Sequence, residues 1–212
     1  MGKTTLFNGL DLPTTWNNND KSQFVSIDSS GLKVHYTDPN DYKAVVIRAN
    51  NPIPSQCELF YFEIEIINEG KNGMIGVGYC TKQNNINDFM PGRKYVEDKE
   101  NKENKSWGCT YHGDDRDFFC SGSGKPYGPT YTVGDTIGCY LNFKNDNKMI
   151  FYTKNGIACY LPNNLDDFKK NLYPCIGLRS QDTTVETNFE HKKFKYLTMT
   201  NDDIGKELWE AC

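Results

Sequence analysis

The feature that most constrains the fold is the dipeptide Asn155-Gly156, which stands between two apolar runs, Lys148–Thr153 and Ile157–Leu161. A type I′ turn needs a positive φ at both central residues, and Asn-Gly is the pair that best tolerates it. A second turn sequence, Lys144–Asn147, separates the first run from a third, Thr136–Phe143. Together these segments predict a three-stranded antiparallel meander.

Strand patterns recur along the rest of the chain, whereas patterns of helical period are nearly absent. In Leu59–Ile67, apolar residues alternate with Tyr61, Glu63 and Glu65, as in a half-buried strand. Aromatic and β-branched residues dominate the other candidates, and both types suit a pleated surface. Many short strands separated by turn residues predict an all-β sandwich or barrel. The remaining candidate strands are Leu32–Tyr36, Ala44–Arg48, Met74–Cys80, Trp107–Tyr111, Tyr173–Leu178 and Thr184–Phe189.

Length and charge narrow the class of protein. The 212 residues suit one domain, and a chain of this size buries about 70% of its unfolded surface, so it needs no metal or disulfide to fold. The net charge of −4 provides no basic face for a phosphate backbone, which argues against general nucleic-acid binding. We find neither an N-terminal signal peptide nor an apolar run long enough to cross a bilayer, and we expect no membrane partner.

The eight cysteines could be free thiols, disulfide partners or metal ligands. No two form a C-x-x-C pair, so zinc-ribbon and thioredoxin-type sites lack their basic spacing. Most lie in apolar segments, where a cysteine behaves as a small buried hydrophobe. We therefore expect eight reduced thiols in a protein of the cytoplasm or the nucleus. They are Cys57, Cys80, Cys109, Cys120, Cys139, Cys159, Cys175 and Cys212.

Three segments are expected to lie outside the sheets. Glu97–Lys105 carries charges and no apolar residue, which predicts a solvated loop. Asn201–Cys212 predicts a short C-terminal helix, because Asn201 can cap it and two aspartates follow in its first turn. Cys120–Lys125, with the proline- and glycine-containing run after it, is interpreted as an ordered Ω-type loop.

Two polar segments are candidates for function. His112 lies beside Asp114 and Asp115, and a histidine with two carboxylates can supply acid–base chemistry or metal ligands. No nucleophile is placed with them, and adjacent aspartates in an extended segment point to different sides, so a structural turn or a polar rim is the alternative. Arg48–Pro54 carries an arginine and two amides and is stiffened by two prolines. Such a loop suits either gripping an extended peptide backbone or merely connecting two strands.

Many short motifs, in order along the chain, resemble the SPRY (B30.2) domain of RanBPM-type scaffold proteins. The resemblance covers residues 12–190 and leaves residues 1–11 as a flexible N-terminus and residues 191–212 as a tail with the short helix. Two departures are Arg93, where the family usually has tryptophan, and the insertion Glu97–Lys105. The matching motifs include Leu12–Trp16, Ile47–Pro54, Tyr111–Asp115, Pro126–Thr130, Gly134–Cys139, Phe151–Gly156 and Asn171–Pro174.

The resemblance implies a two-layer antiparallel, concanavalin-like β-sandwich that catalyses nothing and needs no cofactor or metal. It also implies a non-catalytic module that binds short, extended, often acidic and asparagine-rich peptides through loops at one end of the sandwich. RanBPM-type proteins act as scaffolds or substrate-recognition parts of a ubiquitin-ligase assembly, the CTLH or GID complex.

The hypothesis places a peptide-binding face around Arg48, which matches the family's peptide-gripping arginine and carries five donors in a fixed fork. Its competing role is to brace the loop through an internal carboxylate. Two functions remain as alternatives, a free-standing SPRY effector that competes for scaffold partners and an enzyme or small-ligand binder using His112, Asp114 and Asp115. The residues expected in the peptide-binding face are Arg48, Asn50, Pro52, Tyr111, His112, Asp114, Asp115, Phe118 and Arg179.

Overall fold

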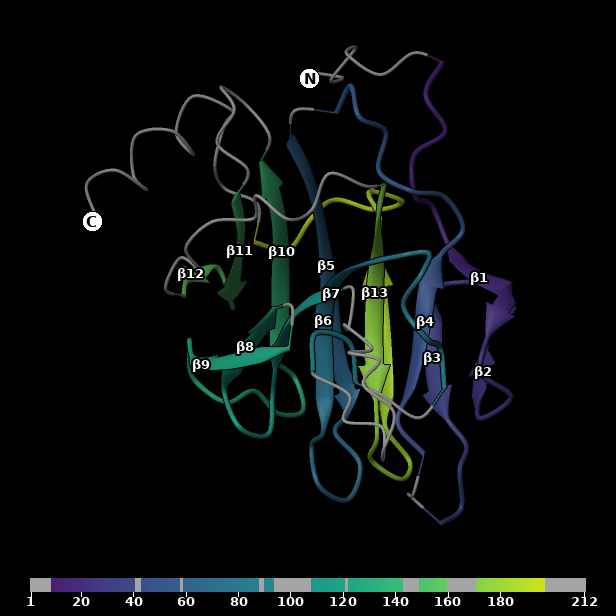
Figure 1. The fold of residues 1–212 in the computed structure, drawn as a ribbon, viewed down its shortest axis with the longest axis vertical. Coiled ribbons are helices and arrows are strands. Elements are labelled where there is room, and N and C mark those ends of the chain that lie inside the picture. The colour runs from purple at the N-terminus through teal and green to yellow at the C-terminus, as the bar shows by residue number, and fades with distance from the viewer. Residues whose placement is uncertain are drawn as a thin grey trace, which may run out of the picture.

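The computed structural model describes residues 9–40, 43–57, 59–87, 90–93, 108–120, 122–142, 149–159 and 171–196. Their strands form two seven-stranded sheets with antiparallel pairing, which confirms the all-β sandwich (Figure 1). Sheet A has the order β1 (Trp16–Lys21), β4 (Val45–Ala49), β13 (Leu172–Leu178), β6 (Ile75–Thr81), β7 (Gly108–His112), β8 (Asp117–Cys120) and β9 (Ser123–Pro126). Sheet B has the order β12 (Ile157–Ala158), β11 (Met149–Lys154), β10 (Thr136–Asn142), β5 (Leu59–Asn68), β14 (Thr184–Asn188), β3 (Lys33–Tyr36) and β2 (Val25–Ile27).

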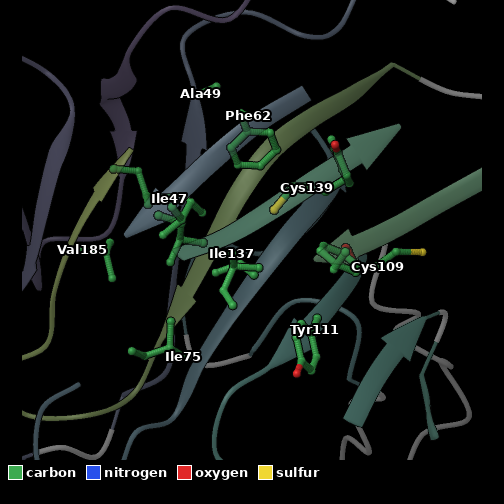
Figure 2. Packing of buried hydrophobic residues seen from close by; sticks show 14 of the residues in the cluster. Ile47, Ala49, Phe62, Ile75, Cys109, Tyr111, Ile137, Cys139 and Val185 are labelled. Atoms are coloured by element: carbon green, nitrogen blue, oxygen red, sulfur yellow. The ribbon is translucent and has the colours of Figure 1, made fainter. Parts of the chain in front are cut away.

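The core lies between the two sheets, and the period of two along each strand determines which residues enter it. On β5, Phe62, Ile64 and Ile66 have no exposed surface, as the alternation predicts. Figure 2 shows residues of both sheets meeting there, among them Ile47 of β4 and Ile137 of β10.

The predicted meander is present. β10 pairs with β11, and β11 pairs with β12 in a register that leaves Asn155 and Gly156 as a two-residue loop. Their φ angles are 51° and 82°, so both have the positive sign that a type I′ turn requires. The turn expected at Lys144–Asn147 lies outside the described residues.

Several strands escaped the sequence analysis. β1 is nearly all polar, and β8 and β9 are only four residues each. The Ω-type loop expected over Cys120–Lys125 is wrong, because Ser123–Pro126 is β9 and pairs with β8 as an edge hairpin. Hydrogen bonding to a neighbouring strand, rather than apolar alternation, stabilises these segments.

The expectation of eight free thiols is also wrong, because Cys109 and Cys120 form a disulfide. The two residues are directly opposite each other on β7 and β8, with Cα atoms 4.3 Å apart. Strand register, which the linear spacing of the cysteines does not reveal, brings the pair together. Cys57, Cys80, Cys139, Cys159 and Cys175 are free.

Alkylation of the purified protein, denatured without reductant, should therefore leave Cys109 and Cys120 unlabelled while the five free thiols react. Mass spectrometry of the digest measures the label on each peptide, and prior reduction should expose both protected positions. Full labelling without reductant would contradict the disulfide.

The first residue of β1 and the segment after β14 pack against the sandwich. The Trp16 side chain is buried, meets the Phe189 ring edge-on and donates from Nε1 to Thr187 Oγ1 at 3.1 Å. On the outer face of sheet B, Glu63 accepts hydrogen bonds from the backbone nitrogens of Lys195 and Tyr196, each at 2.8 Å. Glu63 is consequently buried on the face where the alternation indicated partial exposure.

Two predicted segments, the helix at Asn201–Cys212 and the loop at Glu97–Lys105, lie outside the described residues. Within the part of the chain that the structure describes, there is no helix with the length and hydrophobicity needed to cross a membrane.

Candidate functional site

A strap of chain, residues 82–87 and 90–93, runs from the edge of sheet A, where it pairs with β4, across the outer face of that sheet. Val46 N donates to Ile86 O at 2.9 Å, and Thr110 Oγ1 donates to Pro91 O at 2.5 Å. Pro91 also lies so close to Gly177 that a Cβ atom on residue 177 would clash with the proline ring. The strap therefore buries side chains that point away from the core and that an isolated sandwich would expose to solvent.

Arg48 is one of these side chains, and only 3% of the residue is exposed. Its guanidinium holds Asp20 of β1 through Nε at 3.0 Å and Nη2 at 2.9 Å. Nη1 donates to the backbone oxygen of Asn84 in the strap at 2.7 Å. Arg48 thus ties three segments of this chain together, which gives structural support to its bracing role.

The loop after Arg48 grips an extended segment, and that segment belongs to the same chain. Asn50 Oδ1 accepts from Thr14 N at 3.0 Å, and Asn50 Nδ2 donates to Thr14 Oγ1 at 2.9 Å. Asn51 Nδ2 donates to Leu12 O at 3.2 Å. The amides expected to hold a partner peptide are engaged in holding the entry to β1, and Pro52 beside them is half-buried.

The two aromatic residues expected to anchor a peptide lie in the core instead. Tyr111 has no exposed surface and Phe118 has 6%. Both pack edge-on or tilted against Tyr127, and the Tyr111 hydroxyl donates to Pro129 O. Figure 2 shows Tyr111 inside the cluster of buried side chains. An apolar anchor for a partner would have to come from other residues.

The turn between β7 and β8 brings His112, Asp114 and Asp115 together, with one donor atom of each within 4.8 Å of the others. The divergence expected of adjacent aspartates does not occur, because residues 113–115 form a turn. Arg93 Nη2 binds Asp115 Oδ2 at 2.6 Å, and its guanidinium lies 4.5 Å from the centre of the Phe119 ring. His112 packs on that same ring.

Burial dominates the electrostatics of this cluster. It lowers the pKa of His112 to about 4, with the neighbouring Arg93 charge acting in the same direction. Burial also raises the pKa of Asp114, and the Asp115 charge adds to that effect. The imidazole is therefore neutral at pH 7. Since His112 has no exposed surface, a substrate could not reach it in this structure.

The strand registers place the predicted site residues at opposite ends of sheet A. Arg179 follows β13 and donates its backbone N–H to Met74 O, and Gly113 donates to the adjacent Ile75 O. Arg179 and the aspartate turn therefore share one end. Asn50 lies at the other end, across the seven residues of β13, a distance of roughly 20 Å. One peptide face containing all nine residues does not form.

Three residues that contact the predicted site residues were not assigned to the site by the sequence analysis. Asp20 lies in a polar run without apolar alternation, and Thr110 is a single hydroxyl on a strand, so neither carried a signal. Arg93 was noticeable only because it departs from the family pattern. A cavity of 370 Å³ is lined by Lys21, Ser22, Gln23, Phe24, Lys43 and Asn87, and none of these belongs to the predicted site.

Comparisons with known proteins agree on one family. The family model of the SPRY domain matches residues 59–192. Ran-binding protein 10 of Danio rerio is 38% identical over 188 residues, which cover 87% of this chain and 28% of that protein. Human Ran-binding protein 9 is also 38% identical, over 87% of this chain and 24% of its own length. The chain thus spans only about a quarter of these relatives.

Solved structures support the same architecture. The crystal structure of a human SPRY domain matches with a TM-score of 0.61 at 24% identity, over 81% of this chain and 98% of that one. The SPRY domain of human HERC1 matches with a TM-score of 0.62 at 17% identity, over 84% and 99% of the two chains. At these identities the likeness concerns the fold alone.

Proposed function

The chain belongs to the SPRY domain family, and from this premise we propose that it is a non-catalytic module that binds short, extended peptide segments of partner proteins. The observation that carries the proposal is the family match over residues 59–192, together with 38% identity to Ran-binding proteins 9 and 10. SPRY domains mediate protein–protein interactions. A scaffold or substrate-recognition role in a CTLH- or GID-type ubiquitin-ligase assembly is the more specific form of this proposal.

We place the peptide at the end of sheet A that carries the aspartate turn and Arg179. Arg116 and Arg179 are exposed there, and Asp114 and Asp115 are partly exposed. Guanidinium groups pair with carboxylates and peptide carbonyls, which suits an acidic extended segment. The opposite end of sheet A is less suited to a partner peptide, because Asn50 and Asn51 already bind residues 12–14 of the chain.

A peptide-display selection on the purified protein tests the function, and charge reversal tests the surface. Arg179→Glu should weaken binding of the selected peptide by about 10-fold to 100-fold, because a charged donor is replaced by a repelling carboxylate. Lys125→Glu, at an exposed position on the edge strand β9, is the matched control and should leave affinity unchanged. Affinity is measured by fluorescence anisotropy with the labelled peptide.

Failure to enrich any peptide would argue against the function itself. If a peptide is enriched but binds wild type and Arg179→Glu with equal affinity, the binding surface does not lie at this end of sheet A. The loop Asn50–Pro54 would then be the alternative location.

A further inference from the structure

The β7–β8 turn gathers three side chains whose donor atoms are those of transition-metal sites. His112 provides an imidazole nitrogen, and Asp114 and Asp115 provide carboxylate oxygens, with the three donor atoms within 4.8 Å of one another. Acidic residues alone are common in surface turns. What distinguishes this cluster is the hydrogen bonding of the buried imidazole.

The hydrogen bonds around His112 determine which ring nitrogen carries the proton. Thr110 Oγ1 donates its own proton to Pro91 O at 2.5 Å, so toward His112 Nε2, 3.0 Å away, it can act only as an acceptor. The Nε2 atom of the neutral imidazole is therefore protonated, and the lone pair lies on Nδ1. Nδ1 is buried and has no hydrogen-bond partner.

The cluster holds a second buried acceptor. Asp114 Oδ1 is also buried without a hydrogen-bond partner. Two buried electron-pair donors in one cluster call for a cation or a hydrogen-bond donor between them. Among the described residues, Arg93 contacts this cluster; it directs Nη2 to Asp115, and its buried Nε has no acceptor. The arginine therefore satisfies only one member of the cluster.

We propose that His112 Nδ1, Asp114 and Asp115 bind a divalent transition-metal ion, with Zn²⁺ as the representative ion. One imidazole nitrogen and two carboxylates suit zinc, whereas Mg²⁺ and Ca²⁺ prefer oxygen ligands alone. The contact of Nε2 with Thr110 is the outer hydrogen bond that orients a metal-binding histidine. Because His112 is fully buried and the ligands lie within four consecutive residues, the ion would lock the β7–β8 turn and take no substrate.

Binding of the ion competes with Arg93 for Asp115. The Arg93 side chain is 35% exposed and that of Asp115 is 33% exposed, so both can rotate while His112 stays fixed. Ligand atoms at about 2.1 Å from a common ion lie no more than about 4.2 Å apart, so donor atoms separated by up to 4.8 Å must move closer together. Release of Asp115 by Arg93 allows that movement. This inference does not depend on the proposed peptide binding.

Titration of the full chain with Zn²⁺, followed by thermal unfolding, tests the proposal. Zn²⁺ should raise the melting temperature with saturation at one equivalent, because an ion that binds only the folded state stabilises it. Co²⁺ as a spectroscopic substitute should give d–d bands without the charge-transfer band of a thiolate ligand, which excludes binding at the free cysteines. No peptide is present in this experiment, so its failure would leave the proposed function standing.

Single substitutions test which residues bind the ion. Asp114→Asn, at a partly exposed position that does not disturb the core, should weaken Zn²⁺ affinity at least 10-fold, whereas Asp11→Asn, an exposed aspartate elsewhere, should not change it. Arg93→Gln should tighten binding, because it removes the competitor for Asp115. The absence of any shift with Zn²⁺, or an equal shift in wild type and Asp114→Asn, would overturn the proposal in favour of a bound water or an adventitious ion.

Discussion

Gly78→Ala is expected to destabilise the fold by roughly 3–7 kcal/mol. Gly78 lies on β6 between β13 and β7, with a φ of 155°. A Cβ there would approach Cys109 O and the Tyr152 hydroxyl to less than 3.0 Å and lie 3.0 Å from Thr110 Cα. The expected loss combines overpacking, of about 1–3 kcal/mol, with the loss of a buried hydrogen bond, of about 1–3 kcal/mol, and a backbone penalty of about 1 kcal/mol.

That hydrogen bond is the one from Tyr152 Oη to Cys109 O, at 2.8 Å. It connects the two sheets and passes over the glycine, so the added methyl group must displace it. Urea denaturation followed by circular dichroism measures the change in the free energy of unfolding.

Gly134→Ala is the matched control for this prediction. Gly134 has a φ of 86°, and no atom would lie within 4 Å of its added Cβ, so only backbone strain of about 1 kcal/mol is expected. The double variant Gly78→Ala/Tyr152→Phe should recover part of the loss by removing one of the two clashes. Equal stability of Gly78→Ala and Gly134→Ala would show that β6 and β7 can separate at little cost.

Arg48→Ala is expected to destabilise the protein by roughly 2–4 kcal/mol and to leave the peptide affinity of the folded fraction unchanged. The substitution removes all three hydrogen bonds to Asp20 and leaves the Asn84 carbonyl without its Arg48 donor. Loss of one partner from a largely buried ion pair is expensive, because the remaining polar groups stay desolvated. Thermal unfolding and peptide binding, measured on the same sample, distinguish a structural role of Arg48 from a role in peptide recognition.

Lys82→Ala provides a control at the same carboxylate. Lys82 Nζ binds Asp20 Oδ2 at 2.5 Å, but its side chain is 62% exposed, so its loss should cost less than about 1 kcal/mol. Arg48→Lys should restore only part of the stability, since an ammonium cannot hold Asp20 and Asn84 in a bidentate fork. A large loss of affinity in stable Arg48→Ala protein would instead support the sequence-based hypothesis that Arg48 contacts the peptide.

The strands of the meander and of β5 could be predicted because their signals are local. A type I′ turn requires particular residues at Asn155 and Gly156, and alternation along Leu59–Ile67 follows from the geometry of a single strand. The short strands β8 and β9 could not be predicted in this way, because neighbouring strands stabilise them. The resemblance to the SPRY family was also readable from short motifs in order, and the comparisons confirm it.

The sequence by itself determined the all-β class, the tight turn at Asn155-Gly156 and the family. Only the tertiary structure decided what the polar residues contact. The strap over sheet A buries Arg48 and His112, strand register brings Cys109 opposite Cys120, and the same register separates Asn50 from Arg179. Turn and strand preferences depend on a few consecutive residues, whereas burial and pairing depend on segments that are distant in the sequence. For that reason the fold was predictable from the chain, and the arrangement of its candidate site was not.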